Sequence, residues 1–123
     1  MTWVVVAAGG AMGSIARHAV NVAFTHLFGR PVPYATAAVN VVGSAAIGLL
    51  AGLIASGRLT LSTNMRVLIF VGPLGGFTTF SSFMLDTVAL THAGDRTLAL
   101  SNLAGQVVLG ILAVYAGYYV GAR

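Results

Sequence analysis

Long apolar segments, separated by short polar stretches, dominate this chain of 123 residues. Three segments, at 31–57, 67–85 and 97–122, contain no Asp, Glu, Lys or Arg. A helix needs roughly 20 residues to cross the hydrocarbon core of a bilayer, and each segment is long enough. The pattern therefore predicts three membrane-spanning helices in these regions.

The N-terminal region is apolar over 3–28 except at Arg17 and His18. One interpretation is a single long helix whose second half is amphipathic, with Arg17 near a water-facing end. The alternative is a span over 3–16 that is followed by an interfacial segment. No basic segment precedes the first apolar stretch, so we expect a retained helix and not a cleavable signal peptide.

Turn-forming residues mark the connections between the spans. Proline cannot continue a helix and restricts the residue before it, so 29–33 is expected to join the first two spans. Polar stretches at 56–64 and 92–96 are expected to join the others. The sequence thus predicts an all-α integral membrane protein with one four-helix domain over 1–123 and spans at about 3–28, 33–56, 65–91 and 97–121.

Composition excludes a soluble globule of this size. Hydrophobic residues make up 58% of the chain and charged residues 7%, whereas a soluble domain is about a quarter charged. The net charge of +4 comes from arginines that are spread singly, which does not favour a nucleic-acid interface. The chain has no cysteine, no nucleophile–base pair and no histidine spacing typical of a metal site. We therefore do not expect an enzyme.

The arginines leave the orientation in the membrane open. Three fall on the side of the termini and three nearer the other side, at positions 58, 66 and 123 against 17, 30 and 96. This balance gives the positive-inside rule little to act on. It is compatible with a weak preference for one orientation, or with dual topology, in which copies insert both ways and pair antiparallel.

The middle of the third span is poorly suited to a regular helix. It contains Pro73, Gly75 and Gly76, followed by Thr78 and Thr79. A simple proline kink would explain the proline. A broken helix would instead free backbone carbonyls, which persist in a membrane only inside protein or beside a wet or ion-binding cavity. The paired glycines and threonines favour a break in mid-membrane at such a site.

Phe80 and Phe83 follow this segment and share one helix face because they lie three residues apart. Phenylalanine in a membrane helix more often packs or faces lipid. Here the hydroxyl groups of Thr79, Ser81 and Ser82 interleave with the rings. A ring edge carries positive potential and a hydroxyl can donate a hydrogen bond, so this face could meet an anion.

Polar residues recur every four positions in the second and fourth spans. The second span carries a polar-to-small stripe of Thr36, Asn40, Ser44, Gly48 and Gly52. Such stripes usually pack helices together, but an amide in hydrocarbon needs a hydrogen-bond partner, so Asn40 stands out. In the fourth span, Asn102 and Gln106 share a face, which indicates either a wet path or an interhelical hydrogen bond.

Two ionisable residues inside the spans have open roles. Arg17 could form a vestibule that attracts anions, or its guanidinium could snorkel to the interface. Asp86, late in the third span, is expected to lie at a helix cap or to pair with an arginine.

Three motifs resemble those of the Fluc/CrcB family of fluoride channels, and they occur in the same order. Residues 75–83, GGFTTFSSF, resemble the family's third-helix signature. Residues 9–17, GGAMGSIAR, and 36–44, TAAVNVVGS, are similar to its first- and second-helix motifs. Pro73 and Ser82 depart from the commoner pattern. With the length and the four spans, the resemblance covers the whole chain.

The resemblance implies an antiparallel, dual-topology homodimer with two fluoride pores, which exports fluoride passively across the bacterial cytoplasmic (inner) membrane and gives fluoride resistance. It also implies a structural sodium ion at the dimer centre, bound by the backbone carbonyls of Gly75 and Thr78 from each subunit. Its partners would be fluoride, the lipid bilayer and a second copy. The implied pore residues are Phe80, Phe83, Asn40, Ser81 and Thr36, with Arg17 at the vestibule and Asn102 and Gln106 as a polar path on the fourth helix.

Two other functions fit a small four-helix membrane protein. A proton-coupled multidrug exporter needs a membrane-embedded carboxylate, and no acidic residue precedes Asp86. A non-transporting membrane subunit would explain the packing stripes but not the polar segment of the third span.

Overall fold

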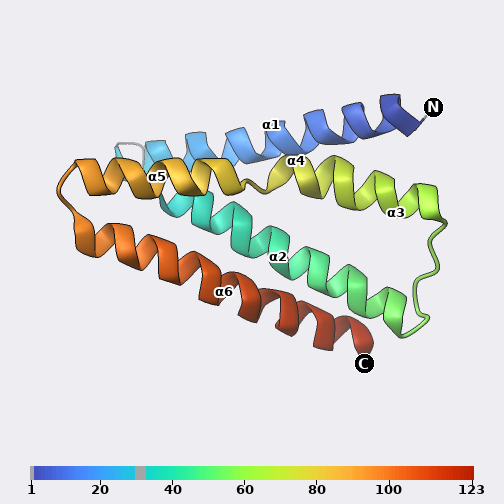
Figure 1. The fold of residues 1–123 in the computed structure, drawn as a ribbon. Helices are drawn as coiled ribbons and strands as arrows, with labels where there is room; N and C mark the ends of the chain where they lie inside the picture. The colour runs from blue at the N-terminus through green and yellow to red at the C-terminus, as the bar shows by residue number, and fades with distance from the viewer. Residues whose placement is uncertain (1, 30–32) are drawn as a thin grey trace.

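The computed structural model describes residues 2–29 and 33–123 as a bundle of helices (Figure 1). Within these residues, four helices are long and apolar enough to cross a membrane, at Thr2–Phe28, Tyr34–Ala55, Thr63–His92 and Arg96–Ala122. This confirms the all-α fold with four spans. Met1 lies outside the described residues, and so does most of the connection expected at 29–33, including Arg30.

The first span is one continuous helix, α1 (Thr2–Phe28). The chain therefore does not divide after residue 16 into a span and a separate segment. Arg17 lies well inside this helix and not near either end. It is eleven residues before Phe28, which is about 16 Å along the axis at the helical rise of 1.5 Å per residue.

The third span consists of four segments: α3 (Thr63–Ile69), the π-helical η1 (Phe70–Leu74), α4 (Gly75–Phe77) and α5 (Phe80–His92). Figure 1 shows them as one bent rod beside α1. The expected break is therefore present.

Its position differs from the sequence expectation, because Pro73 and the two glycines remain helical. Pro73 lies inside η1, whose wider turn accommodates a residue that has no N–H to donate. The backbone leaves the helix two residues after the glycine pair, where Thr78 (φ −81°, ψ 156°) and Thr79 (φ −153°, ψ 120°) are extended.

The two threonines close the helices on either side of the break. The Thr78 hydroxyl donates to the carbonyl of Leu74 at 3.0 Å, within the last turn before the break. The Thr79 hydroxyl accepts a hydrogen bond from the backbone N–H of Ser82 at 3.2 Å and so forms the N-cap of α5. The two hydroxyl groups thus form hydrogen bonds with backbone groups next to the break, which lipid could not satisfy.

Glycines allow α2 (Tyr34–Ala55) and α6 (Arg96–Ala122) to pack backbone against backbone. A Cβ atom at Gly48 would overlap the carbonyl oxygen of Val114, and one at Gly117 would overlap the carbonyl oxygen of Ala45. The small residues at the end of the second-span stripe therefore pack helices, as such stripes usually do.

The third span, which contains the break, lies between α1 and the α2–α6 pair. α1 contacts η1 and α4 on one side, and a Cβ atom at Gly13 would overlap the carbonyl oxygen of Pro73. α5 contacts α6 on the other side. Both chain ends lie at the same end of the bundle (Figure 1), as an even number of crossings requires.

Candidate functional site

Asn40 of α2 holds the extended residues at the break. The backbone N–H of Thr79 donates to Asn40 Oδ1 at 2.8 Å, and Asn40 Nδ2 donates to the carbonyl of Thr79 at 3.0 Å. One amide therefore satisfies both backbone groups of a residue that has no helical partners. This explains why an amide side chain is tolerated in the second span.

A chain of side-chain hydrogen bonds continues from Asn40 across the bundle. Asn40 Nδ2 also donates to Gln106 Oε1 at 2.8 Å, and Gln106 Nε2 donates to Asn102 Oδ1 at 2.9 Å. Asn102 Nδ2 donates to Thr87 Oγ1 at 2.9 Å, and this hydroxyl donates to the carbonyl of Phe83 at 2.9 Å. The two fourth-span amides are buried and form interhelical hydrogen bonds, one of the two alternatives left open by the sequence.

Thr87 is a member of this chain that the sequence interpretation missed. The sequence feature that could have identified Thr87 is its position four residues after Phe83, because a threonine hydroxyl in a helix reaches the carbonyl four residues earlier. A threonine in a membrane helix commonly bonds to its own backbone, so this signal alone would not have indicated a link to α6.

A cavity of about 320 Å³ opens beside the break and brings together most of the expected pore residues. Phe83 is 5% exposed and Phe80 is 73% exposed. Their rings meet edge to face, with centroids 5.9 Å apart and an interplanar angle of 79°. The lining residues are Asn40, Ser44, Ile47, Thr78, Thr79, Phe80, Phe83, Gln106 and Val107.

The described residues that line this cavity are uncharged. Their polar groups are already engaged with the protein to different degrees. Both amide hydrogens of Asn40 are donated, to Thr79 and Gln106. Thr79 Oγ1 lies 3.2 Å from the Oγ of Ser81, which was expected in the pore but does not line the cavity. An ion in the cavity would therefore meet ring edges, hydroxyl groups and the remaining N–H of Gln106.

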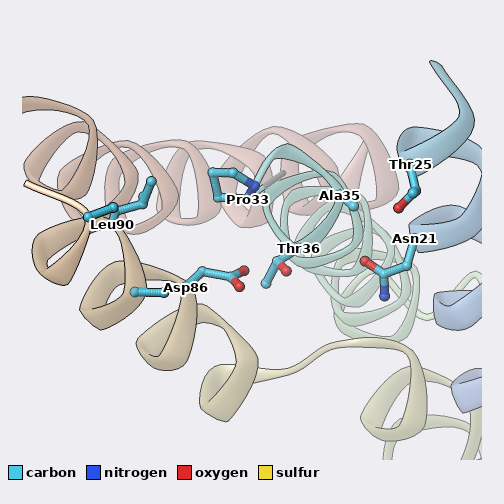
Figure 2. A pocket seen from close by; sticks show the side chains of 9 residues that line it. Asn21, Thr25, Pro33, Ala35, Thr36, Asp86 and Leu90 are labelled. Atoms are coloured by element: carbon cyan, nitrogen blue, oxygen red, sulfur yellow. The ribbon is translucent and has the colours of Figure 1, made fainter. Parts of the chain in front are cut away.

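A second cavity, of about 450 Å³, lies between α1, α2 and α5 (Figure 2). Thr36 is placed here and not in the cavity that contains the phenylalanines. The reason is its position one helical turn before Asn40 on α2. The lining residues are Asn21, Thr25, Pro33, Ala35, Thr36, Asp86, Ala89, Leu90 and Ala93.

Asp86 faces this second cavity from the middle of α5, so the expectation of a helix cap is wrong. No salt bridge joins it to an arginine among the described residues, and Arg30 lies outside them. The other acidic residue, Asp95, forms a cap instead: its Oδ1 accepts from the N–H of Leu98 at 3.0 Å. Asp86 lies three residues after Phe83 and shares its helix face.

The two cavities therefore follow one another along the groove between α2 and α5. On α2, Thr36 lines one and Asn40 the other; on α5, Asp86 lines one and Phe83 the other. Arg17 is half-buried on α1 and forms no salt bridge within the described part of the chain.

Of the expected cation ligands, Thr78 lies in the break and Gly75 begins α4, the segment before it. Among the backbone hydrogen bonds of the described residues, none ends at the carbonyl oxygen of either one. Gly75 is exposed on the single chain and Thr78 is half-buried. Neither carbonyl is therefore paired with the backbone of the described residues.

Comparison with known proteins gives a consistent result. Residues 4–118 match the family model described as CrcB-like protein, Camphor Resistance (CrcB). The chain is 46% identical over 116 residues to the "Fluoride-specific ion channel FluC" of Allorhizobium ampelinum, covering 94% of this chain and 92% of that protein. It is 47% identical to the protein of that name from Agrobacterium fabrum over the same shares, and 44% identical to that of Caulobacter vibrioides over 96% and 93%.

Proposed function

The chain belongs to the CrcB family, and from this premise we propose that it is a fluoride-selective channel that exports fluoride passively across a bacterial membrane. It is a multi-pass membrane protein with four spans and not an enzyme. The observation that supports conduction most directly is the uncharged cavity in which Phe80 and Phe83 meet beside the Asn40 amide.

The chemistry of this cavity suits fluoride. Fluoride holds its hydration shell tightly, so a pore must replace the lost water with other donors along the path. Ring edges carry positive potential and hydroxyl and amide groups donate hydrogen bonds. A fixed positive charge would bind the ion too strongly for rapid release, and the lining residues described above supply none.

Fluoride efflux from liposomes that contain only the purified protein tests this function. A fluoride-selective electrode should record efflux down a fluoride gradient when valinomycin and potassium balance the charge. Protein-free liposomes are the control, and chloride-loaded liposomes should release little chloride. Absence of fluoride efflux, or efflux that requires a proton gradient, would contradict the proposal and would favour the accessory subunit or the exporter.

We further propose that the working unit is an antiparallel homodimer. Phe80 is 73% exposed and Gly75 is exposed on the single chain, although one lines the cavity and the other begins the segment before the break. A second copy would cover both residues. The even balance of arginines between the two sides supports insertion in both orientations.

Single cysteines in two loops test the dual topology. The chain has no cysteine, so Arg58→Cys and Arg96→Cys each create one unique thiol, on opposite sides of the membrane. We expect a membrane-impermeant maleimide to label part of each variant in intact cells and the remainder only after permeabilisation. A variant that labels from one side alone would contradict dual topology.

A structural sodium ion at the dimer centre is part of the same proposal. Hard cations take oxygen ligands, and four carbonyls would converge if Gly75 and Thr78 from two copies met. When bound, the ion would neutralise backbone dipoles that lipid cannot satisfy. The carbonyls fit this role because they accept no backbone hydrogen bond among the described residues.

The pair Gly75→Val and Thr78→Val tests the carbonyl site. The Thr78 hydroxyl already donates to Leu74, so its loss should cost only about 1 kcal/mol of stability and leave the carbonyl in place. At Gly75, the nearest described atom to an added Cβ is the carbonyl oxygen of Phe70 at 3.4 Å, so a single chain accommodates it.

We therefore expect Gly75→Val to lose the dimer or fluoride efflux, and Thr78→Val to retain both. Light scattering after size-exclusion chromatography and the efflux assay measure these outcomes. Normal dimer and normal efflux in Gly75→Val would contradict the carbonyl site, whereas the channel function itself is tested by the wild-type protein.

A further inference from the structure

Three hydroxyl groups line the cavity beside the break, and two of them already donate their hydrogen atoms to the protein. They belong to Ser44, Thr78 and Thr79. The Thr78 hydroxyl donates to the carbonyl of Leu74 at 3.0 Å. The Thr79 hydroxyl donates to Ser82 Oγ at 3.2 Å and accepts from the N–H of the same residue. Neither of these two hydrogen atoms is therefore free to meet an ion.

The third hydroxyl, that of Ser44, takes part in none of the hydrogen bonds that join the described residues around the cavity. Ser44 is half-buried on α2, one helical turn after Asn40. Gly110 of α6 lies opposite, and a Cβ atom there would be 3.7 Å from Ser44 Oγ, so glycine leaves space next to the hydroxyl. Ser44 thus keeps a hydrogen atom that it can donate into the cavity.

Packing alone does not explain a serine at this position. Its neighbour Gly43 does serve packing, because a Cβ atom there would overlap the methyl group of Thr78. A packing role at residue 44 needs only a small side chain, which alanine would provide without a polar group. A hydroxyl that lacks a partner is unfavourable away from water. The hydroxyl of Ser44 therefore favours contact with water or an ion in the cavity.

We propose that Ser44 is a further ion-binding residue of the conduction path, whose hydroxyl donates a hydrogen bond to fluoride as the ion passes the break. This inference rests on the proposed fluoride conduction. Both amide hydrogens of Asn40 are donated within the protein. The side-chain donors that remain among the described lining residues are therefore the Ser44 hydroxyl and the second N–H of Gln106. They belong to α2 and α6, so the ion would exchange water for donors on two helices.

Ser44→Ala removes the hydroxyl and keeps a small side chain, so we expect an unchanged dimer and melting temperature. Fluoride efflux from liposomes at low fluoride should fall by at least about tenfold, the scale of a hydrogen bond to a charged group. A lost contact to the ion raises the fluoride concentration that gives half-maximal flux, so the deficit should shrink at near-saturating fluoride. A smaller number of working channels would instead give the same deficit at both concentrations.

Ser101→Ala on α6 is the matched control, because Ser101 is exposed and does not line this cavity; its efflux should equal that of the wild-type protein. Should Ser44→Ala give no dimer, Ser44→Cys decides the question with the same two measurements, because a thiol is a weaker donor. Wild-type efflux at low fluoride, or an equal deficit at both concentrations, would overturn the role of Ser44. Absence of efflux in the wild-type protein would instead overturn the channel function itself.

Discussion

Replacing Phe80 with isoleucine should reduce fluoride efflux by at least about tenfold, which corresponds to an increase of about 1.4 kcal/mol in the barrier. Isoleucine keeps an apolar side chain of substantial size but removes the electropositive ring edge. Phe80 is 73% exposed on the single chain, so the substitution leaves its folding largely intact. The loss of efflux would therefore report on the ion path.

Phe83→Ile should have a similar effect on efflux but a larger one on stability, because Phe83 is 5% exposed and packs inside the bundle. Both variants are measured with the fluoride electrode after size-exclusion chromatography has established the dimer. Phe28→Ile on α1 is the matched control, since Phe28 pairs with Phe24 at 5.9 Å and lines neither cavity. Wild-type rates in both test variants would mean that the rings only pack.

Gly48→Ala should strongly destabilise the folded protein. The added Cβ would overlap the carbonyl oxygen of Val114, and the obstacle is backbone in a rigid helix, not the flexible end of a side chain. Overpacking typically costs about 1–3 kcal/mol, and separating α2 from α6 would also disturb the Asn40–Gln106 hydrogen bond. The yield of monodisperse protein in detergent and its melting temperature measure this effect.

Gly105→Ala on α6 is the control for this substitution. Nothing lies within 4 Å of a Cβ atom at Gly105, and alanine favours a helix over glycine by about 1 kcal/mol. We therefore expect this variant to be at least as stable as the wild-type protein. Equal yields of Gly48→Ala and Gly105→Ala would mean that α2 and α6 do not pack as closely as described.

The sequence was sufficient to predict the number and approximate position of the spans, because a bilayer imposes length and apolarity on any helix that crosses it. It also indicated the break, since extended backbone in a membrane needs special residues. The exact position of the break could not be predicted. Whether Pro73 ends a helix depends on whether a π turn forms around it, and that turn packs against Gly9 and Gly13 of α1.

The site was only partly predictable for a related reason. Helical spacing identifies which residues of one helix share a face, and so it grouped Phe80 with Phe83 and Asn102 with Gln106. It does not give the register between helices. That register places Thr36 opposite Asp86 and not opposite the phenylalanines, and it brings Thr87 to Asn102.

The hydrogen bonds that cross the bundle from Thr79 to Phe83 all point in one direction. The first donor is a backbone N–H and the last acceptor is a backbone carbonyl, and neither can exchange its role. The three amides and one hydroxyl between them are therefore frozen in a single sense, since reversing any one would set donor against donor. Asn40 and Gln106 are the two of these side chains that line the cavity beside the break, and turning either side-chain oxygen toward a passing cation would break a hydrogen bond of this chain.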